Sequence, residues 1–142
     1  MITSRRGIDL IKSFEGCKLT AYKAVATEKS YTIGYGHYGV PAGLKITQQC
    51  ADCLLTQDLH KFEKSVESLC SALKLNQNEF DALVSFTYNC GAGNLSKLIK
   101  GRNKSQIADA LLLYVKAGGK TLKGLQRRRQ AERNLFLTPE GY

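Results

Sequence analysis

The chain has 142 residues, 43% of them hydrophobic, and a net charge of +9 at neutral pH. This length suits one domain with its own core, and the composition is typical of soluble globular proteins. No apolar run is long enough for a transmembrane helix, and the N-terminus is a poor signal peptide. The positive charge favours a polyanionic partner, either nucleic acid, an acidic cell wall or an anionic membrane surface.

The first predicted element is a helix over residues 4–15, which Gly16 ends. Its apolar residues recur at near-helical spacing, at Ile8, Ile11 and Phe14. Between residues 18 and 39 the period changes to two, as in a strand or a hairpin. The clearest part of that pattern is the run TIGYGH, residues 32–37.

A second helix is predicted after Thr47, a good N-cap, and it extends for about twenty residues along one apolar stripe. A third helix begins after Asn76, which has Glu79 at capping-box spacing, and Gly91 ends it. A short helix follows over residues 95–100.

The C-terminal part of the chain is also predicted to be helical. Ser105 is expected to cap one helix, which the pair Gly118-Gly119 ends, and the last helix covers residues 121–136.

These elements predict an α+β fold in a single domain of residues 1–142. It has a small β-containing lobe over about residues 17–45 and a larger helical lobe over residues 47–137, on which helix 4–15 packs. A binding site is expected in a cleft between the two lobes, because such clefts commonly hold ligands.

Five cysteines, an odd number, argue against a disulfide framework. Cys50 and Cys53 form a CxxC pair, but it lies in a predicted helix without a second pair or a nearby histidine. Free thiols in a reducing cytosol are the preferred interpretation, and we expect no metal or cofactor.

Glu15 ends the first predicted helix, where the helix dipole disfavours a negative charge by about 0.3–1 kcal/mol. A carboxyl group in that position tends to keep its proton, especially if Phe14 and Tyr22 exclude water, and a general acid needs that proton. The alternative is a solvent-facing glutamate at a frayed helix end.

Thr32, Gly34 and Gly36 are expected to share one face of a strand by alternation. Two glycines beside a threonine leave a bare wall with one hydroxyl, against which a sugar ring or a water molecule fits. The alternative is a glycine-rich bend with a structural threonine.

Four motifs in order resemble those of the phage-type lysozymes, the endolysin family. The catalytic signature of that family resembles EG…AYK…YTIGYGH, and its long connecting helix resembles ITQQCADCLLTQDL. Its two later blocks resemble DALVSFTYNCGAGNL and GLQRRRQAERNLFL, so the resemblance covers about residues 7–137. It implies a lysozyme-like fold and an N-acetylmuramidase that cleaves β-1,4 bonds between N-acetylmuramic acid and N-acetylglucosamine in bacterial peptidoglycan.

The family signature is a glutamate, an aspartate nine positions later and a threonine six after that. Glu15 matches the glutamate and Thr32 the threonine, but Ala24 stands where the aspartate is expected, and the loop is two residues longer. Glu28 is the only acid between Glu15 and Thr32. Either Glu28 takes the catalytic role of the aspartate, or it is a solvated loop residue paired loosely with Lys29.

The resemblance implies that Glu15 protonates the leaving glycosidic oxygen while Thr32 and the second acid hold a water molecule on the other face of the sugar, which gives inversion. The candidates for substrate binding are Tyr38, Tyr88 and Asn89. Core packing for Tyr88 and a helix-end hydrogen bond for Asn89 stay open as alternatives.

Two further contacts are implied by the resemblance. His37 is expected to pair with Asp58 rather than to act as a base. Of the three consecutive arginines at positions 127–129, Arg128 or Arg129 is expected to turn toward the core, onto Glu15, since successive helical residues point about 100° apart. A nucleic-acid patch or a solvated face are the alternatives.

The favoured function is therefore that of a phage or prophage endolysin, a monomer that acts on peptidoglycan glycan strands without stable membrane insertion. It is expected to accumulate in the host cytoplasm until it is released to the wall. Because the aspartate is missing, a catalytically weakened peptidoglycan-binding protein is the alternative. A nucleic-acid binder is disfavoured, because the basic residues are scattered and form no recognisable motif.

Overall fold

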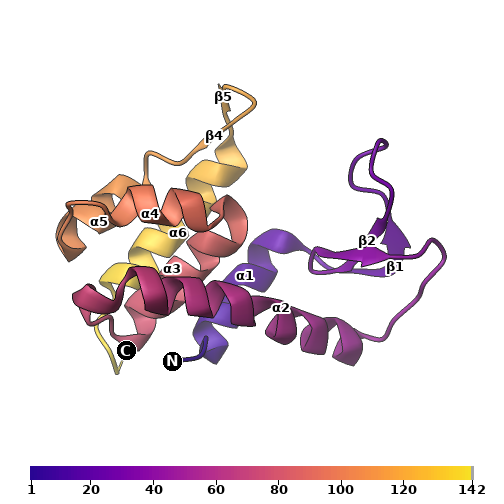
Figure 1. The fold of residues 1–142 in the computed structure, drawn as a ribbon, viewed down its shortest axis with the longest axis horizontal. Coiled ribbons are helices and arrows are strands. Elements are labelled where there is room, and N and C mark those ends of the chain that lie inside the picture. Colours follow the sequence, from indigo (N-terminus) through magenta and orange to yellow (C-terminus); the bar gives the residue numbers. More distant parts are fainter. Residues whose placement is uncertain (142) are drawn as a thin grey trace. The chain divides into compact units, whose positions relative to one another are not determined.

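A computed structural model describes residues 1–141, and internal contacts divide the chain into two compact units. The first consists of Ile11–His60, and the second of Met1–Leu10 together with the chain from Lys61 onward. Helix α1 (Arg5–Glu15) and helix α2 (Gln48–Leu69), both labelled in Figure 1, each contribute residues to both units. The α+β class is confirmed, whereas the single domain with its predicted lobes and cleft stays a prediction.

The unit of residues 11–60 holds a three-stranded antiparallel sheet in the order β1-β2-β3. Its strands are β1 (Lys18–Tyr22), β2 (Tyr31–Gly34) and β3 (His37–Val40). The run TIGYGH is thus a hairpin in which Tyr35 and Gly36 form the turn between β2 and β3. The expectation that Gly36 shares a strand face with Thr32 is wrong, because Gly36 lies in the turn, with a φ of +98°.

Gly34 ends β2 in a left-handed backbone conformation next to α2. It has a φ of +66°, and a Cβ added there would lie 3.5 Å from the Cβ of Ala51 on α2. Ala51 itself is completely buried. That separation is an ordinary van der Waals contact, so the left-handed backbone at the end of β2, and not a lack of space, favours glycine here.

Helix α2 begins as predicted, because the Thr47 hydroxyl accepts a hydrogen bond from the N–H of Cys50 at 3.1 Å. The predicted stripe is buried at Ala51, Leu55, Leu59 and Val66. Leu69, the last residue of the helix, is 40% exposed.

The helical unit is built around α3 (Gln77–Cys90), of which residues 78–87 are all buried. Asn76 and Glu79 form the predicted capping box at its start. Helix α3 packs against α4 and α6, and α5 packs against α4 and α6. The remaining elements are the short 3-10 helix η1 (Ser71–Leu73), α4 (Ala92–Ile99), α5 (Lys104–Leu111) and α6 (Lys123–Leu137).

The start of α5 differs from the prediction by two residues. Asn103, not Ser105, is the N-cap, and its side chain accepts a hydrogen bond from the N–H of Gln106 at 2.9 Å. The Gln106 side chain in turn accepts a hydrogen bond from the N–H of Asn103, and the two bonds together form a capping box. This reciprocal pair stabilises the earlier start more than a lone serine does.

The pair Gly118-Gly119 turns a hairpin and does not end a helix. Strands β4 (Lys116–Ala117) and β5 (Lys120–Thr121) are antiparallel, and the glycines between them have φ values of +59° and +78°. A two-residue turn with positive φ at both positions matches the twist of a hairpin, and glycine adopts it without strain. Helix α5 accordingly stops at Leu111, before the predicted end.

Residues near the N-terminus bind the helical unit through buried carboxylates. The N–H and hydroxyl of Thr3 donate to Glu63 at 2.7 and 2.6 Å, and the N–H of Ser4 donates to Asp81 at 3.0 Å. A Cβ at Gly7 would lie only 2.8 Å from the Cβ of Asp81. The lack of a side chain at Gly7 thus allows α1 to approach α3.

Candidate active site

Glu15 is the last residue of α1, as predicted, and its side chain is half-buried. Gly16 follows with a φ of +68°, and its N–H donates to the carbonyl of Lys12 at 3.3 Å. This left-handed residue ends the helix and directs the chain into β1. The carboxyl group thus lies where the carbonyl end of the helix dipole meets the start of the sheet.

Glu28 lies in the segment that joins β1 to β2, where its N–H donates to the carbonyl of Val25 at 3.0 Å. The residue is half-buried, and its Oε2 atom is buried without a hydrogen-bond partner among residues 1–141. A carboxylate oxygen taken out of water without a donor is costly. The observation favours an inward-facing group over a solvated loop residue.

Thr32 and Tyr38 lie opposite each other on β2 and β3. Thr32 is only 6% exposed, and its hydroxyl forms no hydrogen bond within the described residues, whereas Tyr38 is 54% exposed. The Tyr38 hydroxyl accepts a hydrogen bond from the N–H of Ser30 at 3.4 Å. This pair presents a free hydroxyl beside an accessible aromatic ring, which suits water and sugar respectively.

The other two substrate-binding candidates belong to the helical unit. Tyr88 is half-buried near the end of α3 and packs edge-to-face on Phe62, with ring centroids 5.3 Å apart. Asn89 is exposed, and its Oδ1 accepts a hydrogen bond from Arg129 at 2.7 Å. The ring of Tyr88 is thus partly engaged in packing on Phe62, as the alternative of core packing expects.

Both Arg128 and Arg129 turn inward, which confirms the prediction that one of them does, while Arg127 stays exposed. They flank the fully buried Glu132, with the Nε of Arg129 2.7 Å from Oε1 and the Nε of Arg128 3.2 Å from Oε2. Burial raises the pKa of Glu132, and Arg129 opposes that effect most. The predicted contact of either arginine with Glu15 stays a prediction.

The sequence carried a signal for this cluster that the prediction missed. Glu132 follows Arg129 by three residues and Arg128 by four, the two spacings that bring side chains together on a helix. The hydroxyl of Ser85 on α3 also donates to Glu132, at 2.6 Å. The cluster therefore ties α6 to α3 through buried charge.

A pocket of about 300 Å³ opens beside Asn89 in the helical unit. Arg129 lies at its wall, where its guanidinium also donates to the carbonyl of Tyr114 at 3.3 Å. The lining residues are Asn89, Cys90, Asn94, Tyr114, Lys116, Ala117, Leu125 and Arg129.

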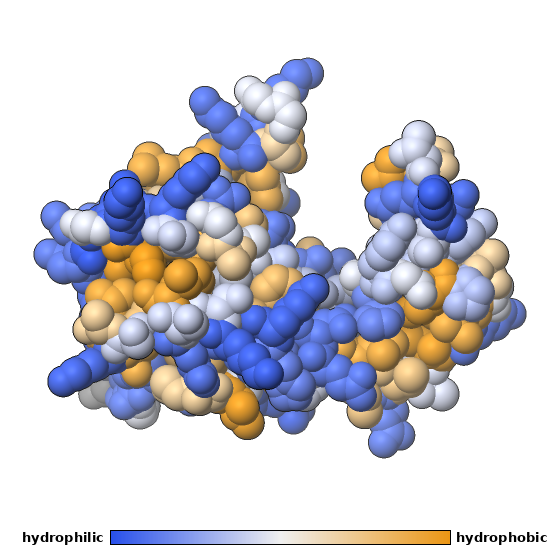
Figure 2. Space-filling view, viewed as in Figure 1, coloured by the Kyte–Doolittle hydropathy of each residue, from blue (hydrophilic) through white to orange (hydrophobic). Residues whose placement is uncertain are grey.

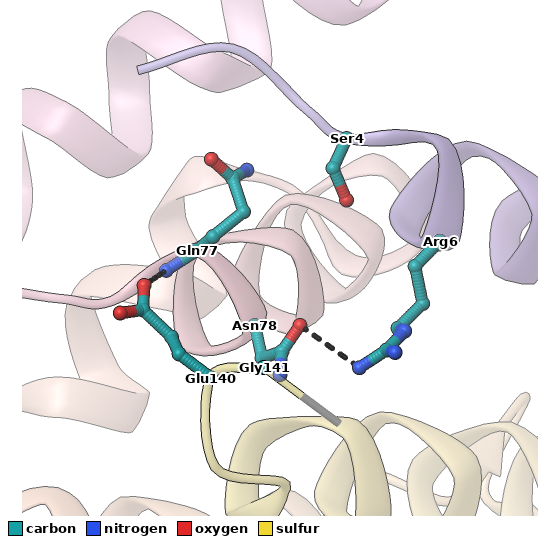
Figure 3. A pocket seen from close by; sticks show the side chains of 6 residues that line it. All are labelled: Ser4, Arg6, Gln77, Asn78, Glu140 and Gly141. Atoms are coloured by element: carbon teal, nitrogen blue, oxygen red, sulfur yellow. Dashed lines mark hydrogen bonds between the residues drawn. The ribbon is translucent and has the colours of Figure 1, made fainter.

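A pocket of about 440 Å³ in the same unit contains none of the predicted site residues (Figure 3). It is lined by Ser4, Arg6, Gln77, Asn78, Glu140 and Gly141. The carboxylate of Glu140 accepts a hydrogen bond from the N–H of Gln77 at 2.8 Å, so this acid serves the start of α3.

His37 pairs with Asp58 as predicted, with Nδ1 2.8 Å from Oδ2. In the same unit, a polar network that the sequence did not reveal joins Tyr35 to α2. Gln48 donates to the Tyr35 hydroxyl at 2.9 Å and to Asp52 at 3.0 Å, and Lys12 lies 3.0 Å from Asp52. Lys12 and Gln48 lower the pKa of Asp52.

All five cysteines are free thiols, of which Cys70 is buried and Cys53 exposed. Burial raises the pKa of Cys70 to about 11, which makes it a poor nucleophile. Within residues 1–141 no group of three or more histidine, cysteine or acidic side chains is placed to hold a metal ion.

Comparison with known proteins places these features in a family. The phage lysozyme family model matches residues 12–132. The endolysin of Lactococcus phage c2 is 49% identical over 140 residues, which cover 98% of this chain and 62% of that protein. The endolysin of Bacillus phage B103 is 46% identical over 147 residues, with 99% of this chain and 56% of that protein covered.

The fold has a close counterpart among solved structures. The muramidase domain of SpmX from Asticaccaulis excentricus superimposes with a TM-score of 0.84 at 36% identity, and the match covers 96% of this chain and 97% of that domain. In contrast, the chain spans only 62% and 56% of the length of the two phage proteins above.

Proposed function

Because the chain belongs to the phage lysozyme family, we propose that it is an endolysin with muramidase activity. It hydrolyses the β-1,4 bond between N-acetylmuramic acid and N-acetylglucosamine in bacterial peptidoglycan, and so contributes to lysis of the host. The family match over residues 12–132 and the similarity to two phage endolysins support this proposal.

Glu15 is proposed as the general acid that protonates the leaving glycosidic oxygen. Its position at the end of α1, half-buried and followed by the left-handed Gly16, supports this role. A general acid gives its proton to the leaving oxygen in the transition state, and a glutamate carboxyl group is one of the side chains that do so.

Glu28 and Thr32 are proposed to hold and activate the attacking water, in place of the family's aspartate and threonine. The single observation that carries this step is the buried Oε2 of Glu28, which lacks a hydrogen-bond donor in the described chain. The unbonded hydroxyl of Thr32 supplies a second contact for the same water. A water held between two such groups attacks the face opposite the acid, which predicts inversion.

Tyr38, Tyr88 and Asn89 are proposed to contact the glycan. Support comes from the 54% exposure of Tyr38 and from the pocket beside Asn89. We expect Tyr38→Ala to raise KM for glycan fragments more than it lowers kcat, because stacking on a tyrosine face binds the sugar in the ground state as well.

The deciding experiment measures turbidity loss of purified cell walls with the full chain. Glu15→Gln is expected to lower the rate by about 10²–10⁴-fold, the range for loss of a general acid. Asp9→Asn, an exposed acid on the same helix, serves as the matched control and keeps the wild-type rate. A wild-type protein that binds walls without clearing them would support the alternative of a catalytically weakened binding protein.

A second measurement tests the water-activating pair. Glu28→Gln should reduce turnover by about 10²-fold or more, while Lys29→Gln, at the exposed neighbouring position, leaves it unchanged. The first product should be the α anomer. Full turnover by Glu28→Gln would remove Glu28 from the mechanism, and a β anomer would require a nucleophile instead.

The proposal includes a monomer that accumulates in the host cytoplasm, acts on the wall after release and does not use nucleic acid or a cofactor. Five free thiols suit a reducing compartment, and the charge of +9 attracts the enzyme to an acidic wall. Fractionation of expressing cells before and after lysis, with gel filtration of the purified chain, tests these points.

A further inference from the structure

Three leucines beside the β4–β5 hairpin are unusually exposed for apolar residues. Leu113 is 70% exposed, Leu122 43% and Leu112 38%. Leu122 lies at the base of the hairpin, where its N–H donates to the carbonyl of Val115 at 2.9 Å, and Leu112 and Leu113 lie in the segment that joins α5 to β4. Single exposed leucines are common, but three exposed leucines within eleven residues of the chain are an unusual concentration of apolar groups in water.

The same part of the chain carries uncompensated positive charge. Residues 110–131 contain six lysines and arginines and no acid. Arg128 and Arg129 are occupied by the buried Glu132, and the acid that precedes the stretch, Asp109, lies 2.9 Å from Arg133. The other four basic residues are exposed and form no ion pair within residues 1–141. They are Lys116, Lys120, Lys123 and Arg127.

Basic and apolar groups thus occur together on one projecting element. The β4–β5 hairpin extends from the helical unit in Figure 1, and Figure 2 shows hydrophilic atoms at its tip with hydrophobic atoms below them. A polyanion in solution, such as a nucleic acid or a charged wall polymer, would bind the lysines and arginines but would leave the leucines exposed to water. An anionic bilayer would bind both kinds of residue, because lysines pair with the lipid phosphates while leucines insert at the boundary between head groups and acyl chains.

We propose that the β4–β5 hairpin and Leu112, Leu113 and Leu122, together called the hairpin surface, form a docking site for an anionic lipid bilayer. The contact is peripheral, and no helix among residues 1–141 is both long and apolar enough to cross a membrane. Docking would confine the protein to a surface without use of the candidate residues Glu15, Glu28 and Thr32. Lys116 and Ala117 of the hairpin also line the pocket beside Asn89, whereas Lys120, Lys123, Leu113 and Leu122 do not, so changes at these four residues test docking apart from the proposed hydrolysis.

The test is sedimentation of the full chain with sucrose-loaded vesicles of phosphatidylcholine, with and without one-quarter phosphatidylglycerol. Binding is expected only with the anionic lipid and should weaken as salt rises. Lys120→Gln with Lys123→Gln should lower the partition coefficient about 25-fold, at about fivefold per lysine. Leu113→Ser with Leu122→Ser should lower it by about tenfold or more, since leucine insertion is lost.

Matched controls come from exposed residues elsewhere in the helical unit. Lys64→Gln with Lys97→Gln removes the same charge, and Leu69→Ser removes a leucine that is 40% exposed. Both should stay within about twofold of wild type. Clearing of purified walls, which contain no bilayer, should be the same in each hairpin variant and in its matched control, so a failure of docking is distinguishable from a failure of catalysis.

Three outcomes would overturn the proposal. The first is absence of binding to the anionic vesicles, and the second is equal binding by the hairpin variants and their controls. The third is loss of binding with the lysine pair but not with the leucine pair, which would indicate a site for a soluble polyanion instead.

Discussion

The Nδ1 atom of His37 lies 2.8 Å from Oδ2 of Asp58, so the first residue of β3 is joined to α2 within the unit of residues 11–60. The side chains are 30% and 26% exposed, which lets water compete only in part. Hydrogen bonds to charged groups stabilise most where solvent is excluded.

We therefore expect Asp58→Asn to lower the free energy of unfolding by about 1 kcal/mol, as measured by urea denaturation. Asp9→Asn is the control, because Asp9 is 61% exposed and lies 3.8 Å from an exposed arginine. That change should have almost no effect. Equal stability of the two variants would show that the His37–Asp58 contact contributes nothing to the fold.

Glu132 holds two buried guanidinium groups, and its loss would leave both without their carboxylate. Glu132→Gln is expected to destabilise the protein by about 3–5 kcal/mol, because an uncompensated buried charge is costly. The measurement is thermal or urea unfolding, with exposed Arg127→Gln as the control that stays within about 0.5 kcal/mol. A mild effect of Glu132→Gln would mean that the arginines find water or other acceptors.

Gly7 is expected to tolerate no side chain. Gly7→Ala places a Cβ within 2.8 Å of Asp81, and the resulting overpacking should cost about 1–3 kcal/mol of stability. Gly93→Ala on α4 is the matched control, since nothing lies within 4 Å of its added Cβ. In a helix that substitution should be neutral or stabilising by up to about 1 kcal/mol. Loss of stability in both variants would point to a general effect of alanine rather than to the contact with α3.

Asp52 should make stability depend on acid pH. Lys12 and Gln48 lower its pKa below the ordinary 3.8, so the folded state holds the carboxylate more firmly than the unfolded chain does. This contribution is fully present above the ordinary pKa and is lost as the pH falls through the lowered one.

The difference in unfolding free energy between wild type and Asp52→Asn should therefore be constant at and above about pH 6 and shrink below about pH 4. Urea titrations at a series of pH values measure it. A difference that grows toward acid pH would contradict the assigned direction.

The local signals in this sequence predicted local structure well. The start of α2 after Thr47 and of α3 after Asn76 follows from side chains that bond backbone groups three residues away. The pairing of His37 with Asp58 and the inward turn of the arginines came from the family resemblance, because periodicity alone says nothing about contacts between distant segments.

The errors arose where two local signals competed. Ser105 and Asn103 are both good caps, and the reciprocal bond with Gln106 selects Asn103. A glycine pair ends a helix or turns a hairpin equally well in sequence. The hairpin forms because the segments on either side of Gly118-Gly119 find each other as β4 and β5.

The sequence by itself determined the α+β class, most helix boundaries, the family and the positions of Glu15 and Thr32, since each depends on residue types within a short stretch. Only the tertiary structure decided that an oxygen of Glu28 is buried without a donor, that Glu132 lies between two arginines and Ser85, and that Arg129 reaches Asn89, forty residues away. Burial and long-range pairing are properties of how segments pack, and no single segment encodes the surroundings that its side chains meet.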